Sequence, residues 1–179
     1  MRIDPTTERW TRDILGHAIR GELAELDRLV NAIGDDRYVE CTALSVAIAA
    51  YVAIDAAGMR WPSEASLHEM ARHAAASTTE FELSKTSVFD FLSRVVFGAD
   101  MLDQVFPDLA TAATLPVLVA ARILASFRPH HERDQTWWDY LDIIEEALEA
   151  AASLDPSVLP ALMWQSRRSI KALPRGPRR

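Results

Sequence analysis

The sequence of 179 residues contains a single cysteine, Cys41, so it cannot form an intramolecular disulfide. One thiol also excludes a zinc or iron–sulfur site built from several cysteines. This cysteine usage fits a reducing compartment, and the first residues lack the apolar core of a signal peptide. We therefore expect a cytoplasmic protein.

Long apolar runs are also missing. The longest uncharged runs, residues 41–54 and 109–121, fall short of the roughly 20 residues of a membrane-spanning helix. We expect both to be buried helices, and we expect no membrane partner. Glycine is scarce, with 6 residues, and no run alternates β-branched with polar residues as a strand would. The length and composition are those of one globular domain, so the sequence predicts an all-α, single-domain helical bundle.

We predict about seven helices within a domain of residues 1–173, followed by a basic disordered tail at residues 174–179. The first helix is expected to start after Pro5, capped by Thr6 or Thr7, and to run to about Ile33, with Gly16 and Gly21 either bending it or allowing a neighbour to approach closely. Six further helices are expected at residues 36–57, 62–76, 87–97, 116–128, 136–153 and 155–173, and residues 100–106 are a candidate for an additional short helix. Two of these begin with a capping-box pattern, Ser87 with Asp90 and Thr136 with Asp139.

Charge is distributed unevenly along the chain. The formal net charge is -7, but residues 167–179 hold six basic groups and no acidic one. The preceding part therefore has 13 basic against 26 acidic residues. Such an acidic body repels a phosphate backbone, so we do not expect nucleic-acid binding. The 17 Arg against 2 Lys, together with 28 Ala, are typical of a bacterial protein from a GC-rich genome.

The histidines show no metal-binding pattern. His68 and His73 are five residues apart, which on a helix separates them by about 140° and prevents joint chelation. Carboxylates instead precede three histidines by four residues, which predicts surface ion pairs. These pairs are Asp13–His17, Glu64–His68 and Glu69–His73.

Nucleophilic catalysis has no clear sequence signal either. Cys41 stands in the most apolar segment beside Glu40, where its pKa should rise and the thiol should be inert. The sequence contains no Gly-x-Ser-x-Gly elbow. We therefore expect a non-enzymatic protein, and we assign no catalytic residue, no cofactor and no metal.

The helix at residues 136–153 is predicted to have one wet face and one packed face. The wet face is acidic and holds Asp139, Asp142, Glu146 and Glu149. The packed face holds Trp137, Leu141, Ile144, Leu148 and Ala151. A solvated acidic face is the simpler interpretation of these carboxylates than a magnesium site, because no glycine-rich phosphate loop accompanies them.

Two groups of residues are candidate interaction surfaces. A mixture of aromatic, basic and imidazole side chains, which is common at binding surfaces, is formed by Phe127, Arg128, His130, His131, Trp137, Trp138 and Tyr140. An apolar seam at helical spacing, which could form a dimer contact or an internal core strip, is formed by Ile19, Leu23, Leu26, Val30 and Ile33.

These observations favour a helical protein-interaction or regulatory domain whose partner is another protein or a second copy of the chain. One alternative is a helix-turn-helix transcription regulator using residues 67–92. That pattern departs from the motif at Ala75, where glycine is usual, and at Glu80 and Glu82, where basic residues would contact phosphates. The other alternative is an enzyme or small-ligand-binding protein with a pocket near Trp137 and Trp138.

Overall fold

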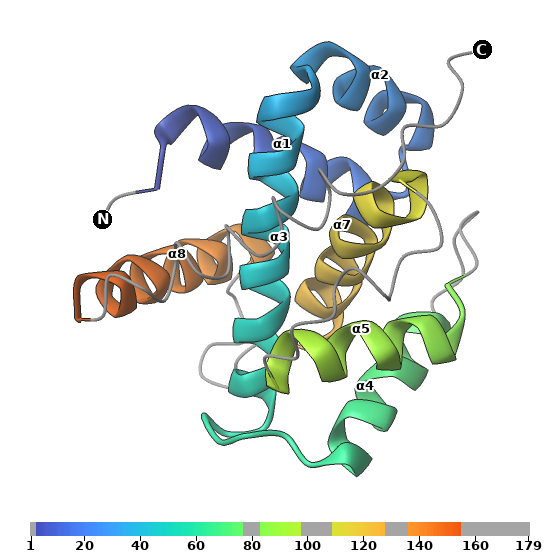
Figure 1. Ribbon diagram of the computed structural model, residues 1–179, viewed down its shortest axis with the longest axis vertical. Coiled ribbons are helices and arrows are strands. Elements are labelled where there is room, and N and C mark those ends of the chain that lie inside the picture. The colour runs from blue at the N-terminus through green and yellow to red at the C-terminus, as the bar shows by residue number, and fades with distance from the viewer. Residues whose placement is uncertain (1–2, 77–82, 98–108, 128–135, 155–179) are drawn as a thin grey trace.

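The computed structural model describes residues 3–76, 83–97, 109–127 and 136–154. Seven helices and no strand occur in these ranges (Figure 1), which confirms the all-α prediction for this part of the chain. The helices are α1 (Pro5–Arg20), α2 (Leu23–Ile33), α3 (Asp35–Ala56), α4 (Glu64–Ala76), α5 (Lys85–Phe97), α7 (Leu109–Ser126) and α8 (Trp137–Leu154). The predicted helices at 100–106 and 155–173 and the tail at 174–179 lie outside the described residues.

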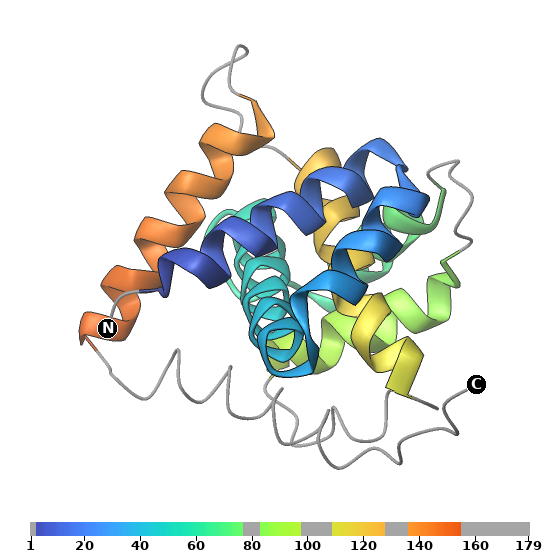
Figure 2. The ribbon, with the colours of Figure 1, turned by 90° about the horizontal axis from the view of Figure 1, so that it is seen from above.

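Helix α3 forms the centre of the bundle and packs against α1, α2, α5, α7 and α8 (Figures 1 and 2). Every residue from Cys41 to Ala50 is buried, because this segment is apolar on nearly all sides. By length and composition alone α3 could cross a membrane, but 72% of its most apolar window is buried inside the bundle. The prediction of a central helix at residues 36–57 is therefore confirmed to within a residue at each end.

The N-terminal segment departs from its prediction in two ways. Helix α1 begins at Pro5 and is capped by Asp4, whose carboxylate accepts from the amides of Thr6 and Thr7, so neither threonine is the cap. The expected single helix to Ile33 is also divided into α1 and α2. Gly21 ends α1 in the left-handed conformation, with φ 71°, and its amide donates to the carbonyl of Ala18. Glycine adopts this conformation without steric cost, so the chain turns there and starts α2 at Leu23. Gly16 instead stays inside α1, where a Cβ atom would lie 3.4 Å from the Trp137 ring. This close approach links α1 to α8.

The predicted start of a helix at Pro116 is wrong, because α7 begins at Leu109 and includes Pro116 in its interior. Proline disfavours a helix interior since it lacks an amide donor and its ring crowds the preceding turn. Residues 115–124 are all buried, however, and this packing holds the segment helical despite the proline.

The two predicted capping boxes have different outcomes. Thr136 and Asp139 form theirs: the Thr136 amide donates to Asp139 Oδ2 at 2.8 Å, and the Asp139 amide donates to Thr136 Oγ1 at 3.4 Å. The box at Ser87 and Asp90 is wrong, because α5 already begins at Lys85. Its cap is Ser84, whose hydroxyl accepts from the Ser87 amide at 3.5 Å.

Candidate functional site

The predicted aromatic and basic surface is only partly an exposed surface. Phe127 is half-buried, and its ring meets the ring of His73 edge-on at 5.8 Å. Trp137 and Trp138 are also half-buried and stack on one another, with ring centroids 3.8 Å apart. The other predicted members on the preceding segment, Arg128, His130 and His131, lie outside the described residues.

Tyr140 does not belong to an exposed surface, which corrects its assignment. Its side chain is buried, and its hydroxyl donates to Asp55 Oδ2 on α3 at 2.6 Å. Burial and the neighbouring carboxylate together raise the pKa of Tyr140. The contact therefore attaches α8 to the central helix and has a structural role.

The predicted dimer seam faces the protein's own core. Leu26 is buried, and Ile19, Val30 and Ile33 are partly buried and pack against the core cluster. Leu23 is half-buried as well. The opposite side of α2 is exposed and polar, with Glu25, Asp27, Arg28 and Asn31. The structure therefore assigns Ile19, Leu26, Val30 and Ile33 to internal packing.

A different apolar group is exposed, and the sequence analysis missed it. Met59, Trp61 and Phe97 are 60%, 70% and 56% exposed. The Trp61 and Phe97 rings are nearly parallel, with centroids 6.5 Å apart. We refer to these three residues as the Trp61 cluster. The sequence indicates this cluster only weakly: Met59 and Trp61, two large apolar residues, flank Arg60 directly after Gly58.

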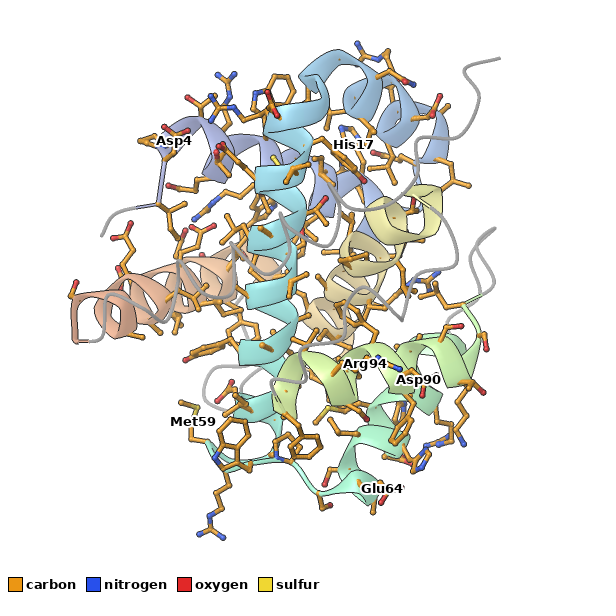
Figure 3. The ribbon with its side chains drawn as sticks, viewed as in Figure 1. Asp4, His17, Met59, Glu64, Asp90 and Arg94 are labelled. Atoms are coloured by element: carbon orange, nitrogen blue, oxygen red, sulfur yellow. The ribbon has the colours of Figure 1, made fainter. Side chains whose placement is uncertain are left out.

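The backbone after α3 presents this cluster. Gly58 has φ 74° and Met59 has φ 56°, so two successive residues are left-handed and the chain turns sharply away from the helix. The Met59 amide closes the turn by donating to the carbonyl of Ile54 at 3.0 Å. A left-handed methionine costs roughly 1–2 kcal/mol. Pro62, which is buried, then fixes the loop against the body. Figure 3 shows Met59 and Glu64 at the end of the molecule that lies away from Asp4 and His17.

A cluster of charges joins α1 to α8. The Arg12 guanidinium contacts the carboxylates of Asp142, at 2.5 Å, and Glu145, and its Nε lies 3.4 Å from Glu8 Oε1. Glu145 is only 6% exposed, and its Oε1 has no hydrogen-bond partner among the described residues. Asp142 conforms to the predicted wet face, whereas the burial of Glu145 was not predicted.

Burial disfavours the charged form of both Arg12 and Glu145, but it determines the direction of the pKa shift only for Glu145. It disfavours the charge on Arg12, but hydrogen bonds to Glu145 and Asp142 outweigh it and raise the pKa of Arg12. For Glu145, burial dominates over the attraction of Arg12 and raises the pKa to about 7. The reason is that Arg12 faces three carboxylates, while Glu145 has one guanidinium and two other acids beside it. The folded state therefore disfavours the ionised form of Glu145.

The rest of the predicted wet face of α8 agrees with the structure. Asp139 and Glu146 are exposed, and Glu149 Oε1 accepts from the Ile3 amide at 2.7 Å. On the opposite face Leu141, Ile144 and Leu148 are buried. The carboxylates of this helix thus serve solvation, capping and attachment to the N-terminal segment.

Two of the three predicted acid–histidine pairs are present. Glu64 lies 3.8 Å from His68, and Glu69 lies 3.0 Å from His73. Arg72 and His73 together lower the pKa of Glu69 to about 2. His17 differs from prediction, because its Nδ1 lies 2.7 Å from the carboxylate of Glu22, the residue before α2, and not beside Asp13. In the described ranges no group of three or more histidine, cysteine or acidic side chains could hold a metal ion.

The proposed helix-turn-helix segment contains α4 and α5, which pack against each other, and its turn lies outside the described residues. The face of α5 is mixed in charge, with Lys85 and Asp90 exposed and Arg94 half-buried (Figure 3). Phe89 on this helix stacks on His68, with ring centroids 3.8 Å apart. This surface lacks the row of basic side chains that phosphate contacts need.

A shallow hollow of about 390 Å³ lies where α2 meets α3, lined by Ile33, Gly34, Asp36, Arg37 and Glu40. Arg37 is already bound there to Asp4 and Glu40, at 2.8 and 3.1 Å. The hollow does not include Trp137 or Trp138, where the ligand-binding alternative expects a pocket.

Cys41 behaves as predicted. It is buried, its Sγ lies 3.8 Å from the Thr7 carbonyl, and burial raises its pKa.

Comparison with known proteins identifies no relative: no family model, curated sequence or solved structure is significantly similar to this chain. Function must therefore be argued from the residues themselves.

Proposed function

We propose that this protein is a non-enzymatic helical interaction or regulatory domain that binds a protein partner through the Trp61 cluster. The observation that carries the proposal is the joint exposure of Met59, Trp61 and Phe97, each more than half exposed. Single exposed apolar residues are common on protein surfaces, but contiguous apolar groups mark interaction sites. Tryptophan in particular is enriched among the residues that supply most of the energy of protein interfaces.

The setting of the cluster supports the same function. Trp61 is on a loop whose conformation is defined on both sides, by the left-handed turn at residues 58–59 and by buried Pro62. The loop therefore has less conformational entropy to lose on binding than a flexible one. Strained backbone of the kind found at Met59 is concentrated in functional loops. Glu145, whose pKa is strongly raised, lies in the contact between α1 and α8, which favours a structural role for it over a catalytic one.

The experiment is site-specific photo-crosslinking in the source cells. A benzoyl-phenylalanine placed at residue 61 should give discrete protein adducts on irradiation. The matched control carries the same group at Ala24, an exposed residue of α2 far along the chain from the cluster. Adducts at position 61 that are absent at position 24 support the proposal. Equal labelling at both positions, or no adduct at position 61, contradicts it.

A further inference from the structure

We propose that the partner of the Trp61 cluster is a second copy of this chain, in a two-fold contact that pairs Arg60 of each copy with Glu64 of the other. This inference rests on the proposed function, because it uses the same surface and names its occupant. The charged residues next to the cluster support it.

The two charged residues at the cluster are available for a partner. Arg60, between Met59 and Trp61, is exposed and makes no ion pair with any described residue. Glu64 begins α4 with a side chain that is 79% exposed, and its ion-pair contact is a long one of 3.8 Å to His68. By comparison, the exposed Arg28 and Arg72 are paired within the chain, to Glu25 and Glu69. Arg60 and Glu64 thus carry opposite charges that the chain itself does not pair closely.

This pattern is complementary to itself. Along the chain, a cation, Arg60, precedes Trp61, and an anion, Glu64, follows it three residues later. A two-fold axis through the centre of such a surface places the cation of one copy opposite the anion of the other, and it does so twice. The same rotation brings the two Trp61–Phe97 pairs together. A partner of uniform charge would leave one of the two side chains facing a like charge.

The exposed area of the cluster sets the expected affinity of the dimer. An aromatic side chain buries about 150–250 Å² when fully covered, so the exposed parts of the four rings in a dimer offer on the order of 500 Å². Stable interfaces bury about 1,200–2,000 Å² in total, and smaller contacts are weak. We therefore expect a reversible dimer with a dissociation constant on the order of tens of micromolar.

Sedimentation equilibrium over about 5–500 µM tests the inference with a charge swap. Arg60→Glu and Glu64→Arg should each weaken association by about tenfold, because each creates two like-charge contacts. The double variant Arg60→Glu/Glu64→Arg should restore it to within about threefold of the wild type. Trp61→Ser should weaken it at least tenfold, and the control Arg28→Glu on α2 should leave it unchanged. Circular dichroism verifies that every variant keeps its helical content.

The outcomes separate this inference from the proposed function. A wild-type protein that stays monomeric at 500 µM, or a double variant no better than the single ones, overturns self-association through this contact. If residue 61 still crosslinks to a different protein in cells, the proposed function stands and only its occupant changes. A dimer that none of the three single substitutions at residues 60, 61 and 64 weakens shows that the copies meet elsewhere.

Discussion

Replacement of Glu145 by glutamine should stabilise the protein at neutral pH and leave it nearly unchanged in acid. Glu145 is buried between α1 and α8, where glutamine keeps the size of the side chain and an oxygen that can accept from Arg12. Arg12 also keeps Asp142 and Glu8 as counterions in the variant. The substitution therefore removes one buried charge without emptying the site.

The magnitude follows from the pKa of Glu145, which is about 7 in the folded protein against an ordinary 4.5. Because each tenfold change in proton affinity corresponds to about 1.4 kcal/mol, ionising this group costs the folded state about 3 kcal/mol. A carboxyl group with a raised folded pKa stabilises the fold fully only below its unfolded pKa. That stability is lost as the pH rises between about 4.5 and about 7. The advantage of the glutamine variant should therefore grow across this window and level off above it.

Urea denaturation followed by circular dichroism, at half-unit steps from about pH 4.5 to pH 8, measures the difference. Other titrating groups are common to both proteins, so their contributions cancel when the two free energies of unfolding are subtracted. Glu146→Gln, an exposed neighbour on the same helix, is the control and should follow the wild-type profile. A difference that stays constant over this range, or that turns against glutamine as the pH rises, would refute the reasoning.

Three further predictions concern how the helices are held. Gly16→Ala should raise stability by up to about 1 kcal/mol, because alanine favours a helix, its Cβ meets the Trp137 ring at 3.4 Å, and the closer atom, Arg20 Nη1 at 3.2 Å, is the end of a flexible side chain that can yield. Gly16→Leu should lower stability by about 1–3 kcal/mol. Tyr140→Phe should lower the free energy of unfolding by about 1.5–3 kcal/mol through loss of the bond to Asp55, and phenylalanine keeps the packing of the ring. Thr136→Ala should cost about 1 kcal/mol by removing the cap of α8. Urea denaturation checks each of them, and a change of the opposite sign contradicts the corresponding contact.

Features that depend on nearby residues could be predicted from the sequence. The capping box of Thr136 and Asp139 needs only residues three apart, and it forms as predicted. The central position of α3 follows from its composition, which is apolar on nearly every side. Gly21 correctly indicated a weak point in the expected first helix, but the sequence could not distinguish a bend from the complete break that the structure has.

Features that depend on distant contacts could not be predicted. Glu145 is buried because Arg12, 133 residues earlier, reaches it from α1, and no local pattern records this pairing. Pro116 looked like a helix start because the packing that surrounds it comes from other helices. Trp61 lies in a loop and belongs to no helical pattern of apolar residues, so the sequence could not show whether its side chain is buried or exposed. The predicted seam spans α1 and α2 and had the spacing of a dimer contact, but all of its residues except Leu23 pack against the core of the same chain.

Hydrogen–deuterium exchange of the wild-type protein at about 5 µM and about 500 µM tests self-association through the Trp61 cluster. We expect slower exchange at the higher concentration in peptides covering residues 57–63 and 93–97, which contain the cluster. Exchange in α2, at residues 23–33, should be the same at both concentrations. Protection confined to α2, or no concentration-dependent change around Trp61 and Phe97, would contradict the claim that two copies of the chain meet at this end of the bundle.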